Sequence, residues 1–258
     1  MKGPKGQRLD ERLVAEGLAD SRSRAQALIR TGRVLVDDAP RDKPGLRVAA
    51  GARVRLRGEE RRYVSRGGDK LAGALADLGI DPAGRVCLDV GASTGGFTDC
   101  LLGAGARQVT AVDVGYGQLA PRLRDDPRVR ALERTNARRL SREAVPEGID
   151  LVTVDVSFIS ARLLLPRLRE LAPRGELLVL VKPQFEVGRD EVGKGGVVRD
   201  DALRASAVAA VRACAEELGY RFGGQAASRL AGPKGNREIF LWLRAPAADD
   251  TGKRTPPR

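Results

Sequence analysis

The chain has 258 residues, of which 42% are hydrophobic, so it can form one large core or a core with a small appended domain. It contains no histidine, which excludes catalysis by Ser/His or Cys/His pairs, and its three scattered cysteines favour buried thiols over a metal site. No apolar run reaches the ~18 residues of a membrane span, so we expect a cytoplasmic protein that does not associate with a membrane.

The net charge of +12 is distributed unevenly along the chain. Residues 1–63 carry 16 basic and 9 acidic side chains, an excess of seven in a quarter of the sequence. An arginine-rich proteome could explain a high overall charge, but it explains this local concentration less well. The asymmetry indicates a polyanionic partner for the first part of the chain.

Residues 1–60 predict a small α+β domain. Leucines at 9, 13 and 18 indicate a short helix, Ser21 is a suitable N-cap for a second helix that stops at Gly32, and strands are expected at 34–36 and 52–57. This stretch, residues 24–36 above all, resembles the S4 RNA-binding domain. The resemblance implies RNA as a partner, and with almost no aromatic residues here we expect contacts to phosphates and RNA shape. The expected RNA-binding residues are Arg8, Arg22, Arg24, Arg30 and Arg33.

We expect residues 61–64 to be a linker, 65–245 a second domain, and 246–258 a disordered tail of proline, alanine and charged residues. In the second domain, strands are expected near 86–90, 108–112, 129–132, 150–154, 176–181, 220–226 and 238–243. Helices are expected near 70–78, 97–103, 118–124, 138–143, 160–171 and 201–218. This alternation predicts a Rossmann-like α/β fold, a largely parallel sheet covered on both faces, with ligands at the carboxyl ends of the strands.

A glycine-rich turn, residues 91–96, joins the strand at 86–90 to the following helix and can present backbone N–H groups to a ligand. Asp113 ends the next strand, 22 residues beyond Gly91, where a carboxylate can bind a ribose hydroxyl or simply cap the strand. The turn is not G-x-G-x-x-G, which disfavours a dinucleotide and favours S-adenosylmethionine, with Asn136 beside the adenine. The expected cofactor contacts are Asp89, Gly91, Ala92, Ser93, Thr94, Gly95, Gly96, Phe97, Thr98, Asp113, Val114, Asn136 and Asp155.

Four polar residues, Lys70, Asp155, Lys182 and Glu238, each lie beside a predicted strand end or at the start of the domain. One such residue alone is more often an ordinary surface or cap residue, so their shared placement at one sheet edge is the informative feature. In this order and context they match the Lys-Asp-Lys-Glu pattern of the FtsJ-type RNA 2′-O-methyltransferases, which residues 64–244 resemble. The resemblance implies that these four are catalytic, that the cofactor is S-adenosylmethionine, that no metal is required, and that Arg66 contacts RNA.

With the S4-like region in front, nearly the whole chain resembles bacterial rRNA (cytidine-2′-O)-methyltransferases, some of which are labelled haemolysins. The segments 89–99, 155–160 and 181–186 carry this resemblance, and residues 61–64 depart from it. It implies ribosomal RNA in ribosomal subunits as the substrate. We expect Lys182 to accept the proton of the ribose hydroxyl, with Lys70 and partial burial favouring the neutral amine, and Asp155 and Glu238 orienting the two lysines.

Two other functions remain open at this stage. A base-methylating enzyme usually carries Asp/Asn-Pro-Pro-Tyr/Phe after the fourth strand, where this chain has Asp155-Val156-Ser157-Phe158. A non-catalytic, S4-type ribosome assembly factor is the second alternative. The glycine-rich loop 185–200 is either a lid or RNA-contacting loop, or a passive connector. The modified nucleotide, the ribosomal subunit and the oligomeric state are not determined by the sequence.

Overall fold

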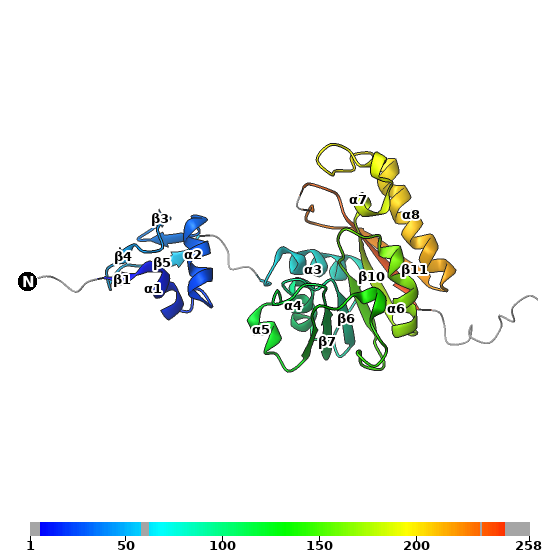
Figure 1. The fold of residues 1–258 in the computed structure, drawn as a ribbon, viewed down its shortest axis with the longest axis horizontal. Helices are drawn as coiled ribbons and strands as arrows, with labels where there is room; N and C mark the ends of the chain where they lie inside the picture. The colour runs from blue at the N-terminus through cyan, green and yellow to red at the C-terminus, as the bar shows by residue number, and fades with distance from the viewer. Residues whose placement is uncertain (1–5, 58–61, 233, 246–258) are drawn as a thin grey trace, which may run out of the picture. The chain divides into compact units, whose positions relative to one another are not determined.

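A computed structural model describes residues 6–57, 62–232 and 234–245. The chain divides into two compact units, residues 1–61 and 62–258, and each contains its own hydrophobic core (Figure 1). We describe each unit by itself.

The first unit is the small α+β domain that the sequence predicts. Its helices are α1 (Leu9–Ala15) and α2 (Arg22–Arg30), and its strands are β1 (Gln7–Arg8), β2 (Val34–Val36), β3 (Ala39–Arg41), β4 (Arg47–Val48) and β5 (Val54–Leu56). Ser21 caps α2 as predicted, since its side chain accepts a hydrogen bond from Arg24 N. The two helices pack Leu9, Leu13 and Ile29 against β2, which leaves the arginines of α2 at the surface.

The second unit is built on a seven-stranded sheet with the order β11-β12-β10-β9-β6-β7-β8. The strands are β6 (Val86–Val90), β7 (Gln108–Val112), β8 (Val129–Leu132), β9 (Leu151–Val154), β10 (Glu176–Val181), β11 (Arg221–Ala227) and β12 (Ile239–Arg244). All the predicted strands are present, with boundaries within one residue. The sheet is mainly parallel, as expected, but β12 lies between β10 and β11 and runs antiparallel to both.

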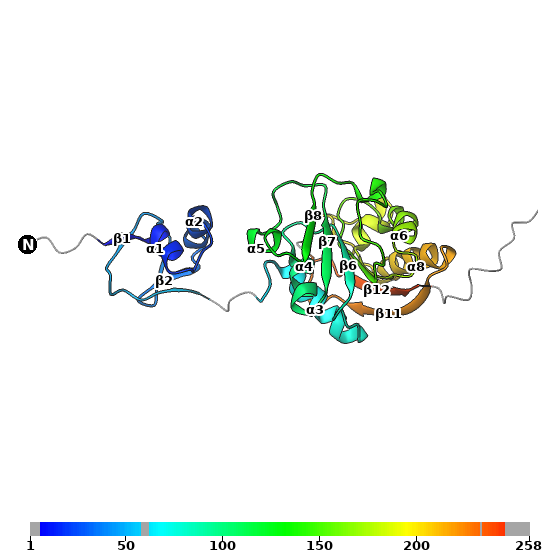
Figure 2. The same ribbon diagram turned by 90° about the horizontal axis from the view of Figure 1, so that it is seen from below.

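Helices cover both faces of this sheet, as the alternating pattern predicts (Figure 2). The helices α3 (Arg66–Leu78) and α4 (Gly96–Gly103) pack on one face, and α6 (Leu165–Leu171) and α8 (Asp201–Glu217) pack on the other. Shorter turns of helix are α5 (Pro121–Arg124), α7 (Pro183–Glu186), η1 (Ala137–Arg139), η2 (Ala161–Leu163) and η3 (Arg189–Glu191).

Four helix predictions were wrong in detail. The helix expected at 70–78 begins earlier, at Arg66, because Ser65 caps it, and the helix expected at 118–124 is reduced to α5. The expected helix at 138–143 is only the 3₁₀ turn η1, because Leu140 turns extended and enters the core, and Arg167 Nε binds its carbonyl at 2.6 Å. The expected helix at 160–171 is divided into η2 and α6. Pro166 lacks the N–H that a continuous helix would bond to the carbonyl four residues earlier, which explains the break.

The predicted linker at 61–64 overlaps the second unit. Tyr63 is buried, its ring lies over Gly68 where any Cβ would overlap it, and Val64 N donates to Asp99 Oδ2 at 2.8 Å. The second unit therefore includes Tyr63 and Val64. Arg61 and the predicted tail 246–258 lie outside the described residues. Cys87 and Cys100 are buried free thiols, as expected, and Cys214 is partly buried.

Candidate active site

The sheet topology brings four sequence-distant segments to one edge. Strand β6 pairs in parallel with β7 on one side and β9 on the other, and β9 pairs in parallel with β10, so their carboxyl ends coincide. Val181 at the end of β10 is opposite Ile239 at the start of the antiparallel β12. Residues that follow the parallel strands therefore meet Glu238, which precedes β12.

The glycine-rich turn brings these segments into contact. At Gly91, where φ is 87°, a Cβ would lie 2.5 Å from the carbonyl oxygen of Asp155, and at Gly96 a Cβ would clash with Ser65 Oγ. The ends of β6 and β9 and the start of α3 can approach only because both positions are glycine. They enclose a cavity of about 270 Å³ lined by Ser65, Arg66, Gly67, Lys70, Gly91, Ala92, Ser93, Thr94, Gly96, Phe97, Asp155 and Ala231.

The four residues of the Lys-Asp-Lys-Glu pattern form two ammonium–carboxylate pairs at this edge. Lys70 Nζ donates to Glu238 Oε2 at 2.6 Å, and Lys182 Nζ lies 2.6 Å from Asp155 Oδ1. Both lysines and Glu238 are buried, while Asp155 is partly exposed. Each lysine thus has its own carboxylate partner, and the formal charges within each pair balance.

Lys182 has a second partner that the sequence reasoning missed. Its Nζ donates to Ser157 Oγ at 2.9 Å, so Asp155 and Ser157 together fix the position of the amine. Ser157 lies in the segment 155–160, which carries the family resemblance, and its spacing of two residues from Asp155 was the available signal.

Asp89 and Thr98 lie inside the fold, outside the cavity lining. The Asp89 carboxylate is fully buried and accepts hydrogen bonds from Thr98 Oγ1 at 2.7 Å and Thr153 Oγ1 at 3.0 Å. Burial raises the pKa of Asp89 to about 7, although these hydrogen bonds act in the opposite direction. Both residues fix the turn to α4 and β9. Gly95, at the start of α4, is also absent from the lining.

Asp113 joins the turn after β6 to the loop after β7, since its carboxylate accepts from Ser93 N at 2.8 Å and Gly115 N at 2.7 Å. It borders a narrow cavity of about 10 Å³ that also includes Gln118 and Glu133. Sequence reasoning missed these two, although Glu133 follows β8 as Asp113 follows β7. The expected contacts Val114 and Asn136 lie elsewhere: Val114 is exposed, and Asn136 is exposed and caps η1 by accepting from Arg138 N.

An aromatic pair follows Ser157 and Lys182 closely in the chain. Phe158 is 88% exposed and has a φ of 69°, an uncommon backbone conformation for a large side chain, and its ring centroid lies 5.4 Å from that of Phe185. Phe158 follows Ser157, the hydrogen-bond partner of Lys182. Such an exposed ring beside buried polar groups is a suitable surface for stacking a nucleobase.

The glycine-rich loop at 185–200 is anchored toward its C-terminal end. The Asn236 side chain is buried, accepts from Val198 N at 3.0 Å and donates to Gly196 O at 2.8 Å. The loop is thereby tied to the segment that leads into Glu238 and β12. Its predicted role as a lid or RNA contact stays a hypothesis, but Gly196 and Val198 are hydrogen-bonded to Asn236.

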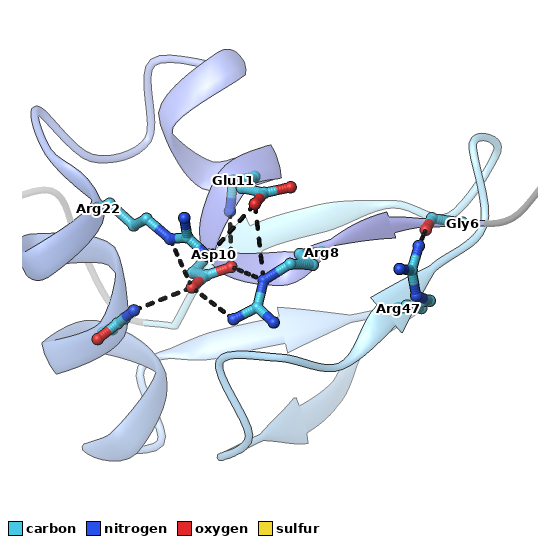
Figure 3. A network of polar contacts seen from close by, with 7 residues as sticks. Gly6, Arg8, Asp10, Glu11, Arg22 and Arg47 are labelled. Carbon is cyan, nitrogen blue, oxygen red and sulfur yellow. Dashed lines mark hydrogen bonds and ion pairs between the residues drawn. The ribbon is translucent and has the colours of Figure 1, made fainter.

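The predicted RNA-binding arginines have different surroundings. Arg8 and Arg22 converge on the buried carboxylate of Asp10 (Figure 3). Arg24 and Arg30 are exposed on α2, and Arg33 Nε donates to the carbonyl of Arg57 at 2.9 Å. Arg66 belongs to the second unit, where it lines the cavity and donates to Ala231 O at 3.3 Å.

Comparison with known families matches an FtsJ-like methyltransferase domain to residues 63–245 and an S4 domain to residues 7–54. The chain belongs to the FtsJ-like methyltransferase family. It joins this catalytic domain to an S4 domain, as the sequence resemblance predicted. The matched range includes both lysine–carboxylate pairs and the glycine-rich turn.

This family member has relatives that match nearly its whole length. The 16S/23S rRNA (cytidine-2′-O)-methyltransferase TlyA of Mycobacterium tuberculosis is 54% identical over 92% of this chain and 89% of its own. Hemolysin A of Brachyspira hyodysenteriae is 40% identical over 90% and 98%, respectively. A solved structure of a "putative hemolysin" from Streptococcus thermophilus has a TM-score of 0.72 and 39% identity, covering 94% of this chain and 89% of that one. Across the described ranges, this chain has no helix that is both long and apolar enough to cross a membrane.

Proposed function

We propose that this enzyme transfers a methyl group from S-adenosylmethionine to the ribose 2′-oxygen of a cytidine in ribosomal RNA. The observation that carries the proposal is the pair of contacts Lys70–Glu238 and Lys182–Asp155, which lie beside the glycine-rich turn at one edge of the sheet. The relatives named as rRNA (cytidine-2′-O)-methyltransferases support the choice of acceptor.

The cavity beside the glycine-rich turn has the size and the groups for the methionine part of the cofactor. It measures about 270 Å³ and is lined by Gly91, Ser93 and Thr94 on one side and by Asp155 on the other. In this proposal Asp113 binds the ribose; Gln118 and Glu133, which line the same small cavity, are further polar groups. S-adenosylmethionine bound there supplies an electrophilic methyl group.

The lysine–carboxylate pairs supply the acceptor chemistry. A ribose hydroxyl is a poor nucleophile at neutral pH, so a base must remove its proton as the oxygen attacks. Lys182, in its amine form, accepts this proton at Nζ. The Asp155 carboxylate, 2.6 Å away, stabilises the resulting ammonium, and Ser157 fixes the direction of the side chain. Lys70, held by Glu238, provides positive charge beside the developing oxyanion.

The remaining features fit an RNA substrate. Phe158 offers an exposed ring beside Lys182, on which the base of the target nucleotide can stack while its ribose enters the site. Arg66, at the cavity wall, can contact an adjacent phosphate. The S4 domain adds the concentrated positive charge that holds structured RNA.

The proposal is tested by incubating the full-length protein with isolated 30S and 50S subunits and S-adenosylmethionine labelled in the methyl group. After digestion to nucleosides, mass spectrometry should find the label in 2′-O-methylcytidine. Label on a base would show a base-methylating enzyme instead. Protein that binds subunits but transfers no label would support a non-catalytic assembly factor.

A further inference from the structure

The S4 unit contains a buried carboxylate, Asp10, that accepts hydrogen bonds from several donors. Asp10 is fully buried, and Arg8 donates to it twice, from Nε and Nη2, each at 3.0 Å (Figure 3). Arg22 Nε at 3.1 Å, Gln26 Nε2 at 3.0 Å and the amide of Glu11 at 3.1 Å complete its coordination. Because its oxygens are saturated in this way, Asp10 holds two guanidinium groups from different elements, β1 and α2, in a fixed relation.

The two guanidinium groups remain partly open to solvent. The side chains of Arg8 and Arg22 are 37% and 54% exposed, while the Asp10 side chain beneath them is completely covered. Guanidinium groups have five donors each, and Asp10 uses only some of them. The outward donors can therefore bind a second anion on the solvent side.

Glu11 occupies that solvent side. Its Oε1 lies 3.3 Å from Arg22 Nη2 and 3.6 Å from Arg8 Nε, so one carboxylate oxygen faces both guanidinium groups. The Glu11 side chain is 43% exposed, and exposed ion pairs of this length contribute little stability. The two acids thus differ in kind: Asp10 is a buried and saturated partner, whereas Glu11 is an exposed and exchangeable one.

We infer that Arg8 and Arg22 together form one binding site for an RNA phosphate. Asp10 positions the two arginines, and Glu11 competes with the phosphate for this site. The inference rests on the proposed function, because it assumes that the S4 domain binds RNA. A phosphate oxygen can replace the Glu11 oxygen, since it also carries negative charge and can pair with both guanidinium groups. With Glu11 in place the cluster has two positive and two negative groups, and its displacement leaves a net positive charge for the phosphate.

The competition predicts a gain of affinity when the charge of Glu11 is removed. In the full-length protein, Glu11→Gln should bind purified 23S and 16S rRNA roughly two- to five-fold more tightly than the wild type, the range expected for loss of an exposed ion pair. Binding is measured by filter retention or fluorescence anisotropy at about 50 to 200 mM salt, where phosphate contacts dominate the affinity.

Glu16→Gln is the matched control. Glu16 lies near the end of the same helix and makes the same kind of charge pair, but its partner is Arg12 at 2.6 Å. Both substitutions change the net charge by the same amount, so only a local competition distinguishes them. If Glu16→Gln tightens binding as much as Glu11→Gln, or if Glu11→Gln leaves affinity unchanged or weaker, the inference is wrong.

A double substitution tests whether the gain in RNA affinity depends on the phosphate-binding site formed by Arg8 and Arg22. In an Arg22→Gln background, Glu11→Gln should give a smaller gain, and Arg22→Gln alone should reduce the salt slope by about one phosphate contact. An undiminished gain in that background would also overturn the inference. The proposed function fails separately: a wild-type protein that binds no rRNA, or transfers no methyl group, contradicts it whatever the variants do.

Discussion

The two units of the protein each bury an aspartate completely, and the two carboxylates have opposite properties. In the S4 unit, hydrogen bonds from Arg8, and then from Gln26 and Arg22, hold the pKa of Asp10 well below its usual range. In the methyltransferase unit, burial raises the pKa of Asp89 to about 7, because its partners are the uncharged hydroxyls of Thr98 and Thr153. Donors that include two guanidinium groups outweigh desolvation at Asp10, whereas desolvation outweighs the two hydroxyl donors at Asp89.

The same contrast separates the two ways in which the units use cations. The S4 unit buries an acid and leaves its arginines at the surface, where they can meet a polyanion. The methyltransferase unit buries Lys70 and Lys182, and gives each a carboxylate. The first arrangement suits binding by charge, and the second suits a proton transfer at a fixed position.

Removal of Lys182 is expected to have the largest effect. Lys182→Ala should reduce methyl transfer about 10²- to 10⁴-fold, the usual contribution of a general base, and leave S-adenosylmethionine binding nearly intact. Single-turnover methylation of rRNA and calorimetry with the cofactor measure the two effects. Lys182→Arg is the sharper comparison, since it keeps a cation beside Asp155 but cannot accept a proton. Wild-type turnover in the arginine variant would reject the role of base and leave an electrostatic one.

Asp10→Asn is expected to destabilise the S4 unit by about 1–3 kcal/mol at pH 7, because an amide cannot satisfy all the donors that converge on this position. The folded-state pKa of Asp10 is lowered, so its contribution is present above the unfolded value of about 4 and is lost as the pH falls below it. The difference between variant and wild type in urea denaturation should therefore shrink between pH 5 and pH 3. Asp20→Asn, at an exposed position, should show no such difference.

Asp89→Asn is expected to change the stability of the protein less than Asp10→Asn does, and to increase it at high pH. The folded-state pKa of Asp89 is raised, so its contribution is complete below pH ~4 and is lost as the pH rises through about 7. The substitution should increase the melting temperature at pH 8 relative to wild type and change it little at pH 5. Thermal melts of this variant and of the exposed Asp125→Asn test the sign. A loss of stability at pH 8 would show that the threonine hydrogen bonds outweigh burial.

Much of the fold follows from local patterns in the sequence. Apolar runs such as 176–181 and 108–112 predict buried strands with the observed limits. A strand covered on both faces is apolar along nearly its whole length, so its ends coincide with the ends of the apolar run. Helix ends were less predictable. Pro166 interrupts one helix and the buried Leu140 ends another, and the second of these depends on a core that no local pattern contains.

The residues of the candidate site could likewise be predicted only in part. Lys70, Asp155, Lys182 and Glu238 could be selected from their places beside strand ends and from the family pattern. Which lysine meets which carboxylate could not, since the residues of the Lys70–Glu238 pair are separated by most of the chain. Asp89 was expected to touch the cofactor, but the strand on which it lies turns it toward Thr153. Ser157, Gln118 and Glu133 became visible only through their contacts and the cavities they line.

By itself, the sequence determined the two-domain organisation, the strand–turn–helix beside the candidate cavity and the identities of the polar candidate residues, because these depend on local composition and spacing. The tertiary structure decided how they meet. In an entirely parallel sheet, Glu238 at the start of its strand would lie at the edge opposite Lys182. Strand β12 instead enters the sheet antiparallel between β10 and β11, and this reversal brings Glu238 to Lys70 at the carboxyl edge.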